Sequence, residues 1–372
     1  AVYNEYSASI FDIILQNISD DVYKKMKVKK VTQGDGPGLL RAMRSVYRTG
    51  TTSRLEGNFR KLIRTRQVGS VTDFAFEFGQ LITFFESVNI KVNDTLAIPK
   101  DTPADHNVKL EKNEGKPHKA PYMEAIGSLM WPSCVCRPDI TLRVNQLSRY
   151  SKNPSKTHWT AVKRIIAYLK KHRTEGIVFK KTTPKGLSAV ETLRALRFTT
   201  YTDSDYAEDL DTRRSTTGYA IYLSGNLVDW GSHRQPVVAH STCEAEIIAG
   251  DDGSRQTEFL RKVLHEVISI ADGKPEKMHD GAFNDVKATL KTKVLTKDFV
   301  KIDNMAAVQV ARNGDFSKKL KHKEVRYYWL HDQVKSGKIE VSHVPGKENP
   351  ADLFTKAVKP DVFAKLRGFI VS

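Results

Sequence analysis

Tyr201–Ile248 reads YTDSDYAEDLDTRRSTTGYAIYLSGNLVDWGSHRQPVVAHSTCEAEII and combines strand-like runs with two carboxylates. A β-branched and aromatic run predicts a strand that ends at Asp203. Two further strand-like runs follow at 219–223 and 227–231, and Glu244 then enters an amphipathic helical pattern. A carboxylate at a strand end and another in the first turn of the next helix can meet above one edge of a sheet. This arrangement is typical of a metal site.

Two more aspartates occur in similar settings further along the chain. Asp303 ends the short apolar run 299–302, and Asp352 stands at the start of the last helix, after the predicted strand 339–344. The predicted order of elements is β-β-β-α-β-α-β-α, with all four carboxylates at one end of the sheet. A lone acid at such a position is more typical of a turn or a helix cap. Four acids together favour a metal site.

Several ordered blocks of the sequence resemble the ribonuclease H domain of copia-type LTR-retrotransposon polyproteins. They are TDSDYAED, RRSTTGYAIYLSG, VDWGSHRQPVVAHSTCEAEIIA and the tail KIDNMAAVQVARN…HVPGKENPADLFTKAV. The resemblance extends from about Gly127 to the C-terminus. It implies an α/β, ribonuclease H-like fold for residues 197–372, with a mixed five-stranded sheet and helices.

The resemblance also implies a reaction, the metal-dependent hydrolysis of the RNA strand of RNA–DNA hybrids. Its catalytic and metal-binding residues would be Asp203, Glu244, Asp303 and Asp352. Such sites hold two Mg²⁺ or Mn²⁺ ions roughly 3.5–4 Å apart, and hard cations prefer oxygen ligands, so several carboxylates are needed. Glu246 is the nearest rival of Glu244, but two positions along a helix it lies on a different face. We therefore expect Glu246 to be a surface or supporting group.

The chain is strongly basic, with 60 Lys and Arg against 43 Asp and Glu and a net charge of +17. Such a balance favours a polyanionic partner, a nucleic acid rather than a membrane. Residues 122–196 resemble the thumb and connection of a copia-type reverse transcriptase, and Arg137–Lys181 contains twelve Lys or Arg and two Asp or Glu. An inert solvated surface is the alternative interpretation. The predicted nucleic-acid-binding residues are Lys163, Arg164, Lys170, Lys171, Lys318, Lys319 and Lys321.

The first part of the chain carries no catalytic pattern. Helical spacing at 70–88 and in two earlier segments predicts an all-α region over residues 1–96, similar to the capsid portion of copia-type Gag proteins. We expect self-association through this region, although an unrelated helical module would show the same spacing. Residues 97–121 are rich in Pro, Lys, Asp, Asn and Gly and predict a linker.

Departures from the family pattern leave a second function open. No Tyr-X-Asp-Asp turn accompanies the pairs at 20–21 and 251–252, so we expect no polymerase activity. The insertion 271–296 threatens the position of Asp303, and Gly250 and Gly253 within a predicted helix each cost roughly 1 kcal/mol relative to alanine, as in a decaying element. The alternative function is a catalytically inactive nucleic-acid-binding or capsid-like assembly relic of a retrotransposon.

The number of cysteines bears on the cellular location of the protein. Three cysteines cannot form a disulfide framework, and no signal peptide opens the chain. We expect an intracellular location, in the cytoplasm or nucleus or within virus-like particles.

Overall fold

The computed structural model describes residues 100–180, 189–271, 297–314 and 325–371. The predicted all-α region 1–96, residues 272–296 of the insertion, and Lys318, Lys319 and Lys321 lie outside the described residues. Among the described residues, no helix is both long and apolar enough to cross a bilayer.

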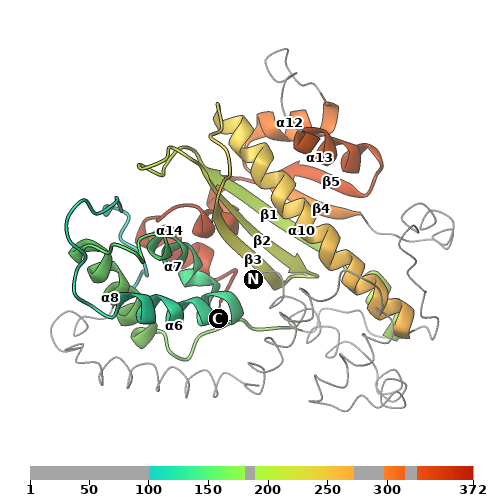
Figure 1. Cartoon of the computed structure of the whole chain (residues 1–372). Helices are drawn as coiled ribbons and strands as arrows, with labels where there is room; N and C mark the ends of the chain where they lie inside the picture. Colours follow the sequence, from blue (N-terminus) through green and yellow to red (C-terminus); the bar gives the residue numbers. More distant parts are fainter. Residues whose placement is uncertain (1–99, 181–188, 272–296, 315–324, 372) are drawn as a thin grey trace, which may run out of the picture.

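A mixed five-stranded sheet forms the centre of the molecule, in the order β3-β2-β1-β4-β5 (Figure 1). The three N-terminal strands are antiparallel, whereas β4 and β5 run parallel to β1. The strands are β1 (Phe198–Asp205), β2 (Thr216–Leu223), β3 (Asn226–Arg234), β4 (Asp298–Ile302) and β5 (Ile339–His343). The predicted α/β class and mixed five-stranded sheet are confirmed.

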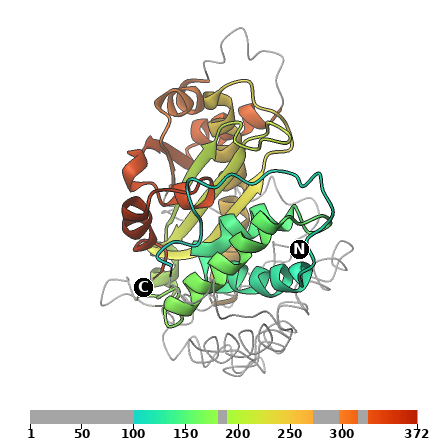
Figure 2. The ribbon, with the colours of Figure 1, turned by 90° about the vertical axis from the view of Figure 1, so that its left-hand side faces the viewer.

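Helices cover both faces of this sheet. The long helix α10 (Thr242–Ala271) lies across one face, with α12 (Met305–Asn313) and α13 (Val325–Lys335) beside it near β4 and β5 (Figure 1). The C-terminal segments lie on the other side of the strands (Figure 2). They are two short 3₁₀ helices, η4 (Gly346–Glu348) and η5 (Pro350–Phe354), and the helix α14 (Pro360–Arg367).

The close packing of α10 on the sheet depends on Gly253. A Cβ at this position would lie 2.7 Å from Thr202 Cγ2 and 3.1 Å from Thr200 Cγ2, both on β1. The backbone of α10 therefore approaches β1 more closely than a larger residue would allow. The interpretation of Gly253 as a sign of decay is corrected, because the glycine is part of how the helix meets the sheet.

A group of helices packs beside β3, at the edge of the sheet (Figure 1). They are α6 (Tyr122–Val135), η2 (Pro138–Ile140), α7 (Thr141–Ser148) and α8 (Lys156–Lys171), while the short α9 (Ala189–Ala195) leads into β1. The indole Nε1 of Trp230 on β3 donates to the Ser133 carbonyl at 2.9 Å, and Asn145 donates to the Ser232 carbonyl at 2.6 Å. One cluster of buried apolar side chains includes residues of these helices, of the sheet and of α14.

Candidate metal centre

Register brings two predicted acids side by side at one end of the sheet. Thr202 of β1 pairs with Ile302 of β4 in the parallel ladder, so the next residues, Asp203 and Asp303, are neighbours. Parallel strands end at the same edge of a sheet, which is why two separate strand-end patterns form one cluster. The inserted segment between α10 and β4 has not displaced Asp303 from this position.

The third predicted acid, Asp352, reaches the same place from η5. Carboxylate oxygens of Asp203, Asp303 and Asp352 all lie within 4.8 Å of one another. Asp203 is 1% exposed and Asp352 is 7% exposed, so two of the three carboxylates are buried. Three acids from β1, β4 and η5 thus form the cluster expected for a divalent cation.

Asn349 and Gly218 explain how η5 can lie so close to β1. The Asn349 side chain donates to the Thr202 carbonyl at 2.9 Å and accepts a hydrogen bond from the Ala351 N–H at 3.1 Å. Gly218, the register partner of Asp203 on β2, leaves room for η5, because a Cβ there would lie 2.6 Å from Thr355 Cγ2. Sequence reasoning assigned no role to these residues.

Beside the three aspartates the structure places Glu246, which we expected to be a surface or supporting group, while the assignment of Glu244 as a ligand stays a prediction. Glu246 Oε1 accepts hydrogen bonds from the Ser204 N–H at 3.1 Å and the Ser204 hydroxyl at 2.8 Å. This places its carboxylate beside the end of β1. Burial, followed by the charges of Asp203 and Asp303, raises the pKa of Glu246 to about 9.

Glu244 instead takes part in the start of α10. Its N–H donates to Ser241 Oγ at 3.1 Å, and its carboxylate accepts from the His240 N–H at 2.8 Å. Ser241 and Glu244 therefore resemble a capping box, in which a serine and a glutamate three residues later satisfy free N–H groups at a helix N-terminus. The Ser-Thr-Cys-Glu pattern was the available sequence signal that Glu244 serves the helix end.

The carboxylates of the cluster lie close enough together to raise one another's pKa values. Burial and the charge of Asp203 raise the pKa of Asp303 to about 6 and that of Asp352 to about 7. Lys356 partly offsets this crowding, because its Nζ lies 3.3 Å from Asp203 Oδ2 and 3.3 Å from Asp352 Oδ1. The Thr355 hydroxyl also donates to Asp203. Sequence reasoning missed Thr355 and Lys356.

The donor set fits a hard divalent cation. All the ligand atoms are carboxylate oxygens, which Mg²⁺ and Mn²⁺ prefer. Two buried oxygens, Glu246 Oε2 and Asp352 Oδ1, accept no hydrogen bond from any residue that the structure describes, although Lys356 Nζ lies 3.3 Å from the latter. Buried carboxylate oxygens without a partner are costly, and a metal ion would remove that cost.

His343 lies at the edge of the centre, at the end of β5. Its Nε2 donates to the main-chain carbonyl of Asp303 at 3.0 Å, and the side chain is exposed. The imidazole therefore supports the segment that carries Asp303.

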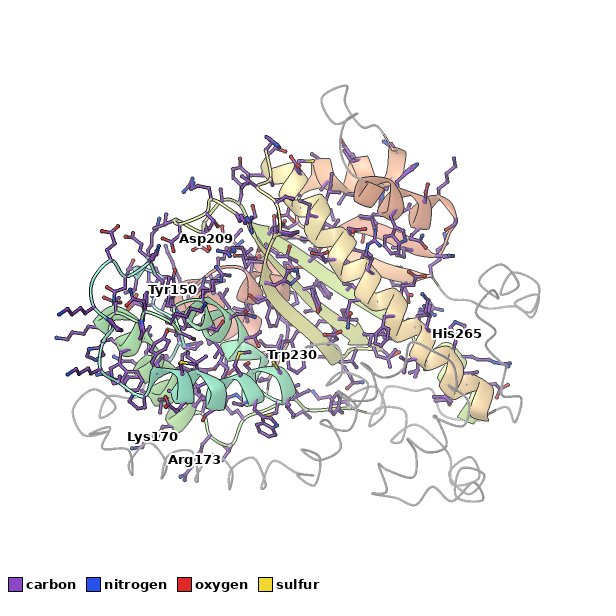
Figure 3. All side chains as sticks on the ribbon, in the orientation of Figure 1. Tyr150, Lys170, Arg173, Asp209, Trp230 and His265 are labelled. Atoms are coloured by element: carbon purple, nitrogen blue, oxygen red, sulfur yellow. The ribbon has the colours of Figure 1, made fainter. Side chains whose placement is uncertain are left out.

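Two of the predicted nucleic-acid contacts on α8, Arg164 and Lys171, pair with acids of the same chain. Arg164 pairs with Asp105 at 3.0 Å and donates to Thr102, and Lys171 pairs with Asp101. These contacts attach the segment 100–121, which contains no helix or strand, to α8. Lys163 is half-buried, and the exposed Lys170 points outward with Arg173 at the edge of the helical group (Figure 3).

Figure 3 places these two basic residues away from Asp209, which lies in the loop that leaves the acidic end of β1. The structure therefore does not bring Lys170 to the carboxylate cluster.

Comparisons with known proteins find similar Pol polyproteins of plant transposons. The chain is 32% identical over 290 residues to the "Retrovirus-related Pol polyprotein from transposon TNT 1-94" of Nicotiana tabacum, covering 75% of this chain and 19% of that protein. It is 29% identical over 275 residues to the "Retrovirus-related Pol polyprotein from transposon RE2" of Arabidopsis thaliana, covering 73% of this chain and 16% of that protein. The chain thus spans about a fifth of the length of these relatives or less.

A shorter relative covers part of the same chain. This chain is 35% identical over 140 residues to the "Secreted RxLR effector protein 161" of Plasmopara viticola. The match covers 38% of this chain and 91% of that protein. No family model and no solved structure matches the chain.

Proposed function

Because the chain belongs to the copia-type retrotransposon Pol polyproteins, we propose that residues 197–371 act as a metal-dependent ribonuclease H. The observation that carries the proposal is the convergence of Asp203, Asp303 and Asp352 within 4.8 Å, with Glu246 beside them. Four carboxylates at one end of a mixed sheet are suited to holding two Mg²⁺ or Mn²⁺ ions. The ribonuclease H-like fold and the copia relatives make this site a nuclease centre in our proposal.

The metal ions, when bound, would activate a water molecule and stabilise the charge that develops on the phosphate during hydrolysis. The residues of the chain hold the oxygens that this chemistry needs. Ser204 fixes one oxygen of Glu246, Thr355 fixes Asp203, and Asn349 fixes the segment that carries Asp352. A site built on strands and bonded to its neighbours in this way has its ligands in place before metal arrives.

The substrate proposed is an RNA–DNA hybrid cut within its RNA strand. Recognition of such duplexes relies on their shape and on 2′-hydroxyl contacts, so little base specificity is expected. The net charge of +17 supports binding to the phosphate backbone, which predicts a steep decrease of affinity with salt.

The decisive experiment is cleavage of a labelled RNA–DNA hybrid by the full chain in Mg²⁺, with Asp203→Asn tested beside it. Asp361→Asn is the matched control, because Asp361 is an exposed aspartate in the first turn of α14. We expect cleavage by the parent and by Asp361→Asn, and at least about a thousandfold loss in Asp203→Asn, since a metal site contributes several kcal/mol of transition-state stabilisation.

Chelator should abolish the activity of the parent as well. A folded parent that binds the hybrid but leaves it intact in Mg²⁺ and Mn²⁺ would refute the nuclease. Such a result would favour the nucleic-acid-binding relic.

A further inference from the structure

The ammonium of Lys356 occupies the position where the acids of the centre come together. Its 3.3 Å contacts to Asp203 Oδ2 and Asp352 Oδ1 join two of the three clustered carboxylates. The Lys356 side chain is 36% exposed, whereas Asp203 is almost fully buried. A partly exposed lysine thus neutralises a buried acid from the solvent side of the centre.

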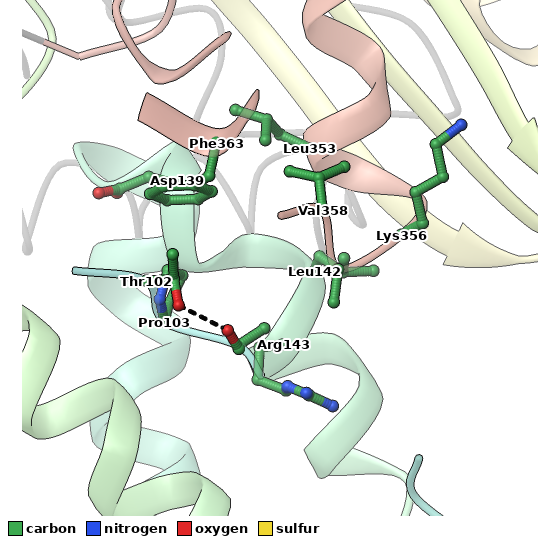
Figure 4. Close-up of a pocket in the computed structure, with 11 residues that line it drawn as sticks. Thr102, Pro103, Asp139, Leu142, Arg143, Leu353, Lys356, Val358 and Phe363 are labelled. Carbon is green, nitrogen blue, oxygen red and sulfur yellow. Dashed lines mark hydrogen bonds between the residues drawn. The ribbon is translucent and has the colours of Figure 1, made fainter. Parts of the chain in front are cut away.

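The position of Lys356 follows from the local backbone. It lies four residues after Asp352, and its N–H donates to the Asp352 carbonyl at 3.2 Å, so one turn of chain presents both side chains on the same side. The preceding residue, Thr355, donates to Asp203. Figure 4 shows the Lys356 stem beside a small cavity, with the ammonium pointing away from it towards the strands.

The same oxygens cannot serve the ammonium and a divalent cation together. A metal ion held by Asp203 and Asp352 would lie within a few ångströms of Lys356 Nζ, and like charges at such distances repel strongly away from bulk water. The four-carbon stem of a lysine has several rotatable bonds, so the ammonium can leave without a change of backbone.

We propose that Lys356 is an internal counter-cation, which holds the carboxylate centre together without metal and leaves it when a divalent cation binds. This inference rests on the proposed metal site, but it concerns the metal-free protein and the affinity for metal rather than catalysis. Its consequence is that metal binding is an exchange of cations, in which the departing ammonium lowers the apparent affinity.

The test measures Mn²⁺ binding to the full chain by calorimetry, without nucleic acid, for the parent, Lys356→Gln and Lys356→Arg. Thermal unfolding of each protein is recorded in chelator and in saturating Mg²⁺. Lys359→Gln is the matched control, because it removes the same charge from an exposed residue three positions further along the chain.

We expect Lys356→Gln to bind Mn²⁺ on the order of tenfold more tightly, because the competing cation is gone. In chelator its unfolding midpoint should be about 2–4 °C below that of the parent, and in saturating Mg²⁺ the difference should largely disappear. Lys356→Arg, which keeps the charge, should resemble the parent in chelator, and Lys359→Gln should change neither quantity.

Four results would overturn the inference. Equal Mn²⁺ affinity of the parent and Lys356→Gln would leave the metal site standing and remove the role of Lys356. An equal gain in Lys359→Gln would assign the effect to overall charge. If neither the parent nor Lys356→Gln bound Mn²⁺, the metal site itself would fail. If Lys356→Gln did not fold in chelator, Lys356→Arg would carry the test, and an unfolded Lys356→Arg would contradict the role of its charge.

Discussion

Two buried charge clusters in this protein differ in their balance. On the helical side, Arg137 and Asp139 form a fully buried ion pair at 2.7 Å, and the Tyr168 hydroxyl also donates to Asp139. At the end of the sheet lie three aspartates and Glu246, and one lysine, Lys356, contacts Asp203 and Asp352. In the first cluster a single aspartate faces two guanidinium groups, those of Arg137 and, at 3.6 Å, of Arg367, whereas the second has more acids than described cations in contact with them.

The pKa shifts of the two clusters have opposite signs. Burial alone would raise the pKa of Asp139, but the Arg137 guanidinium and its hydrogen bonds hold it below its usual range. In the carboxylate centre, burial and neighbouring acids raise the pKa values of Asp303, Asp352 and Glu246. Burial therefore acts differently in the two clusters: the acid of the first is held ionised by a guanidinium, whereas the acids of the second repel one another and could hold a cation.

The largest effect should come from breaking the balanced cluster. Asp139→Asn leaves Arg137 buried without its counter-charge, and such a loss costs about 3–5 kcal/mol of unfolding free energy. Asp303→Asn should act in the opposite direction in chelator, because it removes one of several repelling charges. Urea unfolding of both variants, monitored by circular dichroism, measures the two changes. Destabilisation of equal size in both would contradict the distinction between the clusters.

The next effect separates the two glutamates of α10. We expect Glu246→Gln to lower hybrid cleavage about a hundredfold and Mn²⁺ affinity with it, because it removes a charged ligand from the centre. Glu244→Gln should cost about 1 kcal/mol or less of stability, the usual range for a weakened helix cap, and keep most of the activity. Single-turnover cleavage at fixed Mg²⁺ compares them. The reverse ranking would restore Glu244 as the ligand.

A smaller effect concerns the distance between α10 and β1, on which the place of Glu246 depends. Gly253→Ala should destabilise the protein by about 1–3 kcal/mol, because its Cβ would meet Thr202 of β1. Gly127→Ala is the control, since a Cβ on this glycine of α6 would meet no described atom within 4 Å beyond its own helix. That change should stabilise the protein by about 0.5–1 kcal/mol. Thermal unfolding of both variants decides whether close packing accounts for Gly253.

The last expected effect, which is spread over several pH units, is a pH dependence that differs between the clusters. Raised pKa values mean that the folded protein binds more protons than the unfolded chain, so Asp303, Asp352 and Glu246 lower stability as pH rises from about 4 to 9. Each contributes at most about 1.4 kcal/mol per pH unit. Asp139 has a lowered pKa, so its stabilisation is present above the usual aspartate range and is lost as pH falls.

Thermal midpoints measured from pH 5 to 9, in chelator and in Mg²⁺, test this pH dependence. Mg²⁺ should flatten the decrease above pH 6, because bound metal keeps the carboxylates deprotonated. An unchanged slope in Mg²⁺ would show that the titrating groups lie elsewhere.

The strands and three of the acids could be predicted because each depends on a local pattern. Asp203 lies near the end of a strand, Asp303 follows one and Asp352 lies in a helical turn, and parallel pairing then brings the strand ends together. The choice between Glu244 and Glu246 depends on how α10 is rotated against β1. That rotation is fixed by tertiary contacts such as the Ser204 hydroxyl, which no spacing rule contains.

The basic residues of α8 show what a run of charges leaves out. A run of Lys and Arg predicts a phosphate-binding face only if no acid of the same chain reaches it. Asp101 and Asp105 lie some sixty to seventy residues earlier and pair with Lys171 and Arg164. Gly253 is similar, because the sequence shows its cost to a helix but not the strand that lies against it.

The bond from the Trp230 indole to the Ser133 carbonyl restricts how the coding sequence can recombine. A breakpoint between 141 and 230 would separate the indole donor from two acceptors, the Ser133 carbonyl and Thr141 Oγ1. It would also divide the shared apolar interior. The unit that can be inherited as a folded whole is therefore the helices together with the sheet, and a sheet copied without the upstream helices would lack part of its interior.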